Sequence, residues 1–137
     1  GNPEMVNALM RVKSNIDSGL SQANQEMGIA ALDLPSVWVD NNNAVYQKRR
    51  DKVVSVLNEI GVPAVAPKGA LYIWTPIPEG YTSAEFAQKL LDEVNVVVTP
   101  GNGYGPGGEG YIRLSLTIPD DQIDEGLRRL AQLRVNS

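Results

Sequence analysis

The stretch Gly101-Asn-Gly-Tyr-Gly-Pro-Gly-Gly-Glu-Gly110, followed directly by Tyr111-Ile-Arg-Leu-Ser-Leu116, places one arginine on an apolar strand behind a loop with six glycines. Ordering six glycines costs much conformational entropy. Such a loop is therefore normally found where another group, such as a ligand, must come close to the backbone. The guanidinium of Arg113 is planar and permanently charged, and it matches a carboxylate or a phosphate. The pattern alone leaves two interpretations open: a ligand site or an ordinary surface arginine.

Three of these glycines also match the dinucleotide-binding fingerprint G-x-G-x-x-G, at Gly103, Gly105 and Gly108. That fingerprint requires a helix directly after it, so that a phosphate binds at the helix N-terminus. Here the alternation of apolar Ile112 and Leu114 with polar neighbours predicts a strand. The sequence context therefore argues against a dinucleotide site.

The composition excludes several classes of chemistry. The 137 residues are 42% hydrophobic and 20% charged, as in one globular domain with or without an appended element. The chain has no cysteine and no histidine, so we expect no disulfide, no thiolate nucleophile and no metal site. The net charge of -4 argues against nucleic-acid binding, and no apolar run reaches the length of a membrane span.

Hydrophobic periodicity and capping residues predict the secondary structure on either side of this loop. The predicted helical segments are residues 2–33 with a break at 14–19, residues 36–60, a helix opening at Thr82 and a helix opening at Pro119. The predicted strands are residues 62–66, 70–75, 96–99 and 111–118. Tyr72 and Trp74 are predicted to pack in the core, the usual place for strand aromatics.

This order of elements predicts an α+β fold, with helices packed on one face of a short, mostly antiparallel sheet. Residues 1–40 are predicted to form a helical arm, and residues 41–137 a small domain. The arm has apolar positions that a compact module of this size does not need. We therefore expect the arm to pack on a surface outside the chain.

Three polar residues outside the core positions merit comparison. Strand alternation separates Arg113 from the apolar face of its strand. Asn15 lies in the polar break at 14–19, where a helix kink satisfied by its own side chains is the favoured interpretation. Lys68 lies between a proline and a glycine in a predicted turn, where a structural role is favoured over that of a catalytic amine.

Six stretches resemble, in the same order, the C-terminal part of the class I/II (fold type I) pyridoxal-phosphate-dependent aminotransferases. The similarity is greatest to the LL-diaminopimelate aminotransferase branch, in which a Lys-Ser-Asn-Ile-Asp-Ser-Gly stretch is familiar. The stretches are Gly1-Asn-Pro-Glu4, Arg11-Val-Lys-Ser-Asn-Ile-Asp-Ser-Gly19, Pro67-Lys-Gly-Ala-Leu-Tyr-Ile-Trp74, Glu79-Gly-Tyr-Thr-Ser-Ala-Glu-Phe86, Val97-Val-Thr-Pro-Gly101 and Gly110-Tyr-Ile-Arg-Leu-Ser-Leu116.

The resemblance implies roles for two residues. Arg113 is expected to bind the α-carboxylate of an amino-acid substrate, and Asn15 to reach the cofactor and substrate, often across a dimer interface. The glycine loop is expected to help the small domain close over the substrate. The resemblance further implies pyridoxal phosphate as cofactor, amino acids and 2-oxo acids as substrates, and a homodimer in the cytoplasm.

In the family, the lysine that forms the Schiff base with the cofactor lies before the Gly-Asn-Pro-Glu stretch, as does most of the large domain. We therefore expect this chain to be a C-terminal fragment that lacks the N-terminal large domain and is inactive alone. A lyase, decarboxylase or synthase of the same superfamily remains an alternative. A stand-alone α+β module that binds a small carboxylate through Arg113 without catalysis is another.

Overall fold

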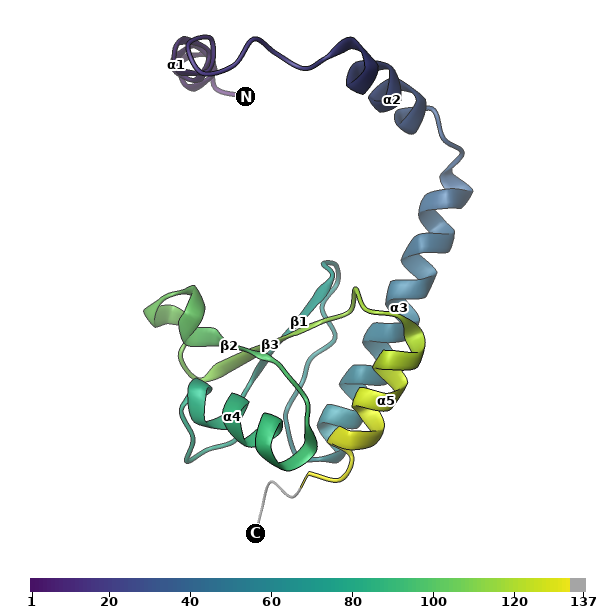
Figure 1. The fold of residues 1–137 in the computed structure, drawn as a ribbon, viewed down its shortest axis with the longest axis vertical. Helices are drawn as coiled ribbons and strands as arrows, with labels where there is room; N and C mark the ends of the chain where they lie inside the picture. Colours follow the sequence, from purple (N-terminus) through teal and green to yellow (C-terminus); the bar gives the residue numbers. More distant parts are fainter. Residues whose placement is uncertain (134–137) are drawn as a thin grey trace. The chain divides into compact units, whose positions relative to one another are not determined.

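The computed structural model describes residues 1–133, so the last four residues of the predicted 41–137 domain lie outside the described range. The chain divides into two compact units, Gly1–Val39 and Asp40–Ser137. The helices are α1 (Pro3–Lys13), α2 (Gln22–Leu32), α3 (Ser36–Glu59), α4 (Ser83–Val94) and α5 (Asp120–Leu130) (Figure 1). The strands are β1 (Tyr72–Pro76), β2 (Thr99–Pro100) and β3 (Tyr111–Ser115), and two 3₁₀ helices, η1 (Gly101–Tyr104) and η2 (Pro106–Gly108), follow β2.

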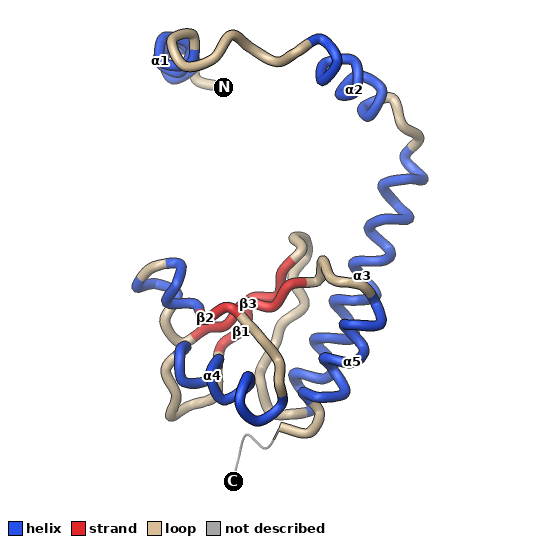
Figure 2. The backbone as a smooth tube through the Cα atoms, viewed as in Figure 1, coloured by secondary structure: helices blue, strands red, loops and turns tan. Residues whose placement is uncertain are grey.

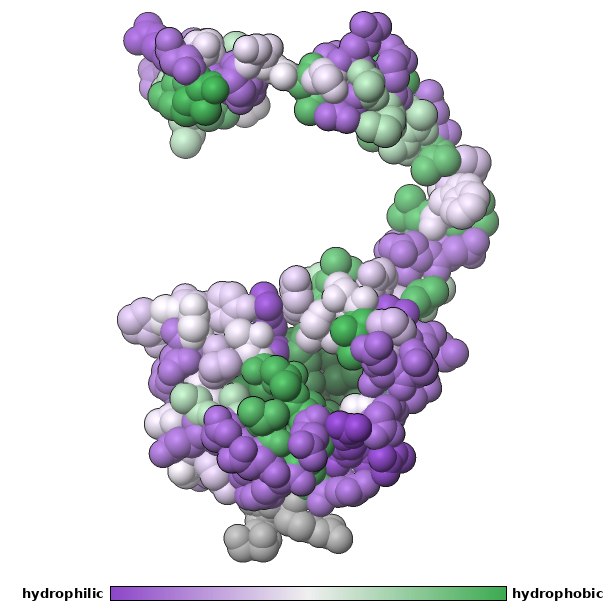
Figure 3. Space-filling view, viewed as in Figure 1, coloured by the Kyte–Doolittle hydropathy of each residue, from purple (hydrophilic) through white to green (hydrophobic). Residues whose placement is uncertain are grey.

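The first unit consists of helices without a core. The Asn2 side chain accepts hydrogen bonds from the backbone N–H groups of Glu4 at 2.9 Å and Met5 at 3.3 Å, which confirms the predicted N-cap. The predicted break is also confirmed, because α1 ends at Lys13 and α2 begins at Gln22. Neither α1 nor α2 buries a single side chain. Their apolar residues are therefore exposed to solvent in this structure (Figure 3).

The second unit is built around an antiparallel sheet of three strands in the order β1-β3-β2 (Figure 2). Arg113 on the central strand pairs with Trp74 of β1 and with Thr99 of β2. Alternate residues of the strands are fully buried, among them Ile73 and Ile112. The sheet therefore has one apolar face, as the alternation predicts.

All three long helices of this unit contribute to the core on that apolar face. The helical core residues are Val53 and Leu57 of α3, Phe86, Leu90 and Val94 of α4, and Ile123 and Leu130 of α5. They pack against the buried residues of β1 and β3. The predicted α+β fold, with helices on one face of a mostly antiparallel sheet, is confirmed.

A capping box begins α4. The Glu85 backbone N–H donates to Thr82 Oγ1, and the Thr82 N–H donates to Glu85 Oε2 at 2.8 Å. The predicted Thr82-x-x-Glu85 box is confirmed, and it explains where the helix starts. The Thr82 backbone N–H and the Thr82 hydroxyl both donate to the Glu85 carboxylate, and these two bonds hold the pKa of Glu85 below its usual value.

The predicted strand at residues 62–66 is wrong. Val62 and Ala64 alternate inward as a strand would, but their backbone groups bond to the end of α3. The Val62 N–H donates to Leu57 O at 2.8 Å, and Ala64 O accepts from the Asn58 side chain at 3.0 Å. The segment thus satisfies its polar groups without a partner strand.

Two other predicted strands are shorter than expected. The segment 96–99 contributes only Thr99 to β2, because the Val96 N–H bonds back to Leu90 O at the end of α4. The predicted strand 111–118 ends at Ser115. Ser115 and Thr117 share a side-chain hydrogen bond of 2.8 Å there, and just beyond the strand the Leu116 N–H still donates to Leu71 O at 2.9 Å.

Candidate functional site

Arg113 lies on the face of the sheet that the helices leave uncovered. Its neighbours on β3, Ile112 and Leu114, point into the core, while Arg113 itself is half-buried. None of the salt bridges formed among residues 1–133 involves Arg113. Within the described chain its guanidinium charge is therefore not neutralised by a carboxylate.

Aromatic rings hold the Arg113 guanidinium instead. Its Cζ atom lies 4.1 Å from the centre of the Tyr72 ring and 4.7 Å from that of Tyr104. Both distances are within the range of favourable cation–π contacts. Tyr72 is on β1 and Tyr104 is on η1, so the arginine joins the sheet to the glycine loop.

Further ring contacts extend this arrangement. Trp74 meets Tyr104 edge-on at 5.7 Å between ring centres and stacks on Tyr111 at 5.6 Å. We call Tyr72, Trp74, Tyr104, Tyr111 and Arg113 the open-face cluster. The prediction that Tyr72 and Trp74 pack in the core is wrong, because they are 39% and 40% exposed. The core positions of β1 are Ile73 and Thr75, one residue out of step with the aromatics.

Tyr104 was not recognisable as a site residue from the sequence. It lies in the glycine loop, where neither helical nor strand periodicity predicts a side-chain direction. Strand alternation and the glycine loop indicate Arg113, but for Tyr72 and Trp74 the sequence signal is only that they alternate on one face of a strand, a pattern equally typical of core packing.

The glycine loop needs two of its glycines for close packing of its backbone. A Cβ atom on Gly101 would lie 2.0 Å from the carbonyl oxygen of Gly108, and one on Gly108 would lie 2.0 Å from the oxygen of Gly101. The loop therefore folds back on itself as η1 and η2. This close backbone contact carries Tyr104 toward Arg113.

A carboxylate anchors the end of the loop to the start of α4. Glu109 Oε1 accepts hydrogen bonds from the Ser83 backbone N–H at 2.7 Å, from Ser83 Oγ at 3.0 Å and from the Gly110 N–H at 3.0 Å. Ser83 is fully buried. The bonds from Ser83, and then that from Gly110, lower the pKa of Glu109 from its ordinary value of 4.5.

This anchor predicts a pH dependence of loop order. Folding lowers the pKa of Glu109, so its contribution is full above about pH 4.5 and is lost as the pH falls through the lower folded value. We expect Glu109→Gln to increase amide hydrogen exchange in residues 101–110 at neutral pH. The difference from the unmodified protein should shrink as the pH falls below about 4.5. A difference that stays constant with pH would show that ionised Glu109 does not hold the loop.

Asn15 lies in the turn after α1, in the other unit from Arg113. Its Nδ2 donates to Arg11 O at 2.7 Å, and Asp17 nearby accepts from Lys13 Nζ and from the Gly19 N–H. These bonds match the interpretation of a helix end satisfied by its own side chains. Asn15 is nevertheless exposed.

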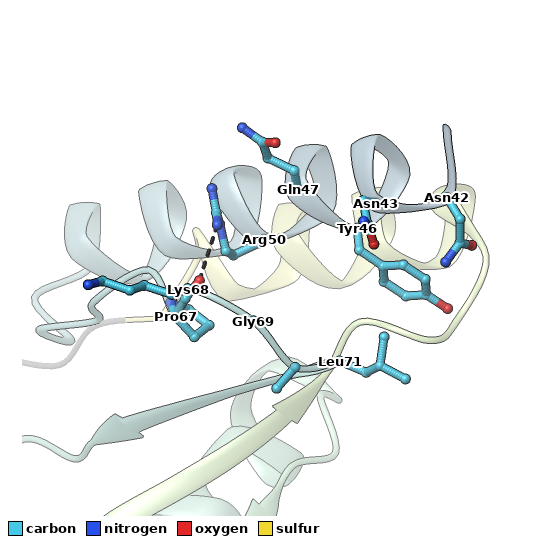
Figure 4. Close-up of a pocket in the computed structure, with 10 residues that line it drawn as sticks. Asn42, Asn43, Tyr46, Gln47, Arg50, Pro67, Lys68, Gly69 and Leu71 are labelled. Atoms are coloured by element: carbon cyan, nitrogen blue, oxygen red, sulfur yellow. Dashed lines mark hydrogen bonds between the residues drawn. The ribbon is translucent and has the colours of Figure 1, made fainter. Parts of the chain in front are cut away.

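One pocket of the second unit lies beside α3, between that helix and the turn before β1 (Figure 4). Its volume is about 570 Å³, and Arg50 and Lys68 bring positive charge to it. Arg50 is already paired, since it bonds to Asp51 at 2.7 Å and donates to Pro67 O at 3.1 Å. Arg113 does not line this pocket. Lys68 is exposed in the turn rather than enclosed, in agreement with its predicted structural role.

A second, smaller pocket of about 160 Å³ lies between α5 and the segment before β2. Its lining contains no ionisable side chain. It lacks the groups that acid–base or nucleophilic chemistry needs. A third pocket of about 440 Å³ is lined by Asp121, Glu125 and Arg129, of which Glu125 and Arg129 are already paired with each other at 2.7 Å. Because Arg113 has no carboxylate partner among the described residues, the open-face cluster is the better candidate for recognition of a charged ligand.

Residues 1–130 match the family model for aminotransferases of class I and II. The chain belongs to this aminotransferase family. Members of the family generally depend on pyridoxal phosphate, and aminotransferases act on amino acids and keto acids. The predicted resemblance is thus confirmed at the level of the family.

The chain is also similar to curated aminotransferases. It is 58% identical over 134 residues to an LL-diaminopimelate aminotransferase of Dehalococcoides mccartyi, a match that covers 98% of this chain and 34% of that protein. It is 44% identical to an LL-diaminopimelate aminotransferase of Aquifex aeolicus, covering 98% of this chain and 35% of that one. The chain therefore spans about a third of the length of these relatives.

Solved aminotransferase structures share the fold. A Staphylococcus aureus aminotransferase superimposes with a TM-score of 0.85 at 33% identity, covering 96% of this chain and 35% of that one. Substrate-bound BacF of Bacillus subtilis gives a TM-score of 0.86 at 28% identity, covering 100% and 36%. The residues matched in these structures thus share the fold of the C-terminal part of aminotransferases.

The described residues do not form a complete cofactor site. Three of the chain's five lysines are engaged in surface ion pairs, with Asp17, Asp124 and Glu93. Lys48 and Lys68 are exposed. No lysine within residues 1–133 is enclosed where a cofactor aldehyde could be held away from water.

No described helix is both long and apolar enough to span a membrane.

Proposed function

We propose that the chain is the C-terminal part of a pyridoxal-phosphate-dependent aminotransferase that transfers an amino group from an L-amino acid to a 2-oxo acid. Arg113 binds the α-carboxylate of the substrate. The cofactor, which serves as the electron sink of the reaction, is held mainly by residues outside this chain. The chain by itself is catalytically inactive.

One observation carries the proposal: Arg113 presents a guanidinium without a carboxylate partner on the uncovered face of a sheet. An arginine fork forms two parallel hydrogen bonds with a carboxylate, which fixes both position and orientation. In a reaction at the α-carbon, that orientation determines which bond faces the cofactor. The open-face cluster does not enclose a ligand, so the substrate site needs a second surface over it.

The first unit supports the existence of such a surface. Its apolar residues include Met5, Leu9 and Met27, which are at least 63% exposed, and its two short helices bury nothing. Short helices without a packed face are marginal in water. We therefore propose that this arm packs against the large domain and a second subunit of a cytoplasmic homodimer, where Asn15 contributes to the cofactor and substrate site.

The substrate we propose is LL-diaminopimelate. The support is the name of the relatives, which are 44–58% identical to this chain. The side-chain end of the substrate is recognised largely outside this chain. The choice of LL-diaminopimelate therefore rests on the similarity to these relatives, and the described geometry does not contribute to it.

The test is a transamination assay on a full-length protein that contains this chain. With pyridoxal phosphate bound, we expect LL-diaminopimelate and a 2-oxo acid to yield the corresponding new amino acid. Other L-amino acids, tested as donors at the same concentration, should react more slowly. If the amino group comes from a different donor, LL-diaminopimelate is not the substrate, but the protein is still an aminotransferase. Release of carbon dioxide or ammonia without amino transfer would overturn the aminotransferase assignment.

A further inference from the structure

We infer that Tyr72 and Tyr104 are positioning residues, which fix the plane of the Arg113 guanidinium so that it meets a carboxylate in one orientation. The inference rests on the proposed function, because it assigns a task to the rings around the same arginine. It also gives the glycine loop a role in substrate recognition, since Tyr104 belongs to η1.

An arginine side chain has many rotamers and is mobile unless other groups hold it. An arginine with no partner loses much rotational freedom when it binds a ligand, and that loss weakens binding. Arg113 has no carboxylate partner among residues 1–133. Another group must therefore hold it if it is to be ready for the substrate.

Two tyrosine rings hold the Arg113 guanidinium. With its Cζ atom 4.1 Å from the Tyr72 centroid and 4.7 Å from the Tyr104 centroid, the guanidinium lies over both rings. A guanidinium that stacks on an aromatic face keeps the N–H groups at the rim of its plane free to donate. A carboxylate partner in the protein would instead occupy those same groups.

The rings themselves are fixed. Tyr72 belongs to β1, which pairs with β3 along its length. Tyr104 forms an edge-to-face contact with Trp74, which in turn stacks on Tyr111. The backbone contact between Gly101 and Gly108 and the Glu109 anchor fix the loop that carries Tyr104.

The consequence is a prediction for full-length enzyme carrying Tyr104→Leu or Tyr72→Leu. We expect kcat/KM for the amino-acid donor to fall about five- to tenfold, mainly through a higher KM, the size expected from loss of a partly desolvated cation–π contact. Tyr104→Phe and Tyr72→Phe keep the ring and should restore the value of the unmodified enzyme. Tyr46→Leu is the matched control, because Tyr46 makes a similar contact 5.5 Å from Arg49, away from the cluster.

The preference for substrates with an α-carboxylate separates the two roles, because a purely structural role of the tyrosines would leave that preference unchanged. We expect the preference for an L-amino acid over the primary amine that lacks its α-carboxylate to fall about five- to tenfold in the leucine variants. In an Arg113→Ala background, Tyr104→Leu should have no further effect on that preference.

The outcomes separate this inference from the proposed function. If Arg113→Ala abolishes the preference while both leucine variants retain it undiminished, the positioning role is overturned and the carboxylate site stands. If Arg113→Ala leaves the preference intact, the carboxylate site itself is overturned. If the phenylalanine variants fail to restore activity, the hydroxyl groups rather than the rings carry the effect, and the inference is overturned as well.

Discussion

Arg113→Ala in a full-length protein is expected to lower kcat/KM for the amino-acid donor by about two to four orders of magnitude. Two charge-assisted hydrogen bonds to the α-carboxylate are lost, each worth roughly 1.5–3 kcal/mol. The loss should be similar for every amino-acid donor, because the arginine binds the α-carboxylate that all of them share. Steady-state kinetics with several amino acids, on protein loaded with pyridoxal phosphate, measure this effect.

Two further variants sharpen the comparison. Arg113→Lys should recover only part of the activity, because an ammonium group cannot form two parallel bonds in one plane. Arg128→Ala is the matched control, since Arg128 is a surface arginine on α5 whose side chain is 63% exposed. Equal kinetics for Arg113→Ala and Arg128→Ala would remove Arg113 from substrate binding.

Gly101→Ala is expected to disrupt the glycine loop and lower both stability and activity. The new Cβ atom would lie 2.0 Å from Gly108 O and 2.7 Å from Tyr111 O, both of them backbone atoms that cannot simply rotate away. Overpacking of this kind costs about 1–3 kcal/mol or more. Because the loop carries Tyr104, its displacement should also release the Arg113 guanidinium. Thermal unfolding and donor kinetics of the full-length variant report the two effects.

Gly103→Ala provides the control for that variant. Gly103 lies in the same loop, but no atom is within 4 Å of the position of its Cβ, and its φ is outside the range that disfavours other residues. We expect nearly unchanged stability. If Gly101→Ala behaves like Gly103→Ala, the close backbone contact in the loop does not exist in the protein.

Local signals in the sequence predict those parts of the fold that local chemistry determines. Asn2 and the Thr82-Glu85 pair mark helix starts, because their side chains bond to nearby backbone groups. The segment 62–66 was mispredicted because alternation describes which residues are buried and does not describe where the backbone bonds. Asn58 and Leu57 of α3 supply those bonds here, and no local pattern reports them.

The residues of the candidate site also differ in how far local sequence signals predict them. Alternation on β3 separates Arg113 from the core without further information, and the glycine loop before it indicates a close approach. The direction of Tyr104 depends on the contact between Gly101 and Gly108, seven residues apart, and on the anchor from Glu109 to Ser83, 26 residues away. Contacts of that range follow from the folded chain and could not be predicted from periodicity.

The most direct test of the carboxylate site is a crystal structure of the full-length protein with an amino-acid substrate or an unreactive analogue bound. We predict that both oxygens of the α-carboxylate lie within hydrogen-bonding distance, about 2.7–2.9 Å, of the Arg113 guanidinium nitrogens. A substrate whose α-carboxylate is held by other residues, with Arg113 directed to solvent, would contradict the account.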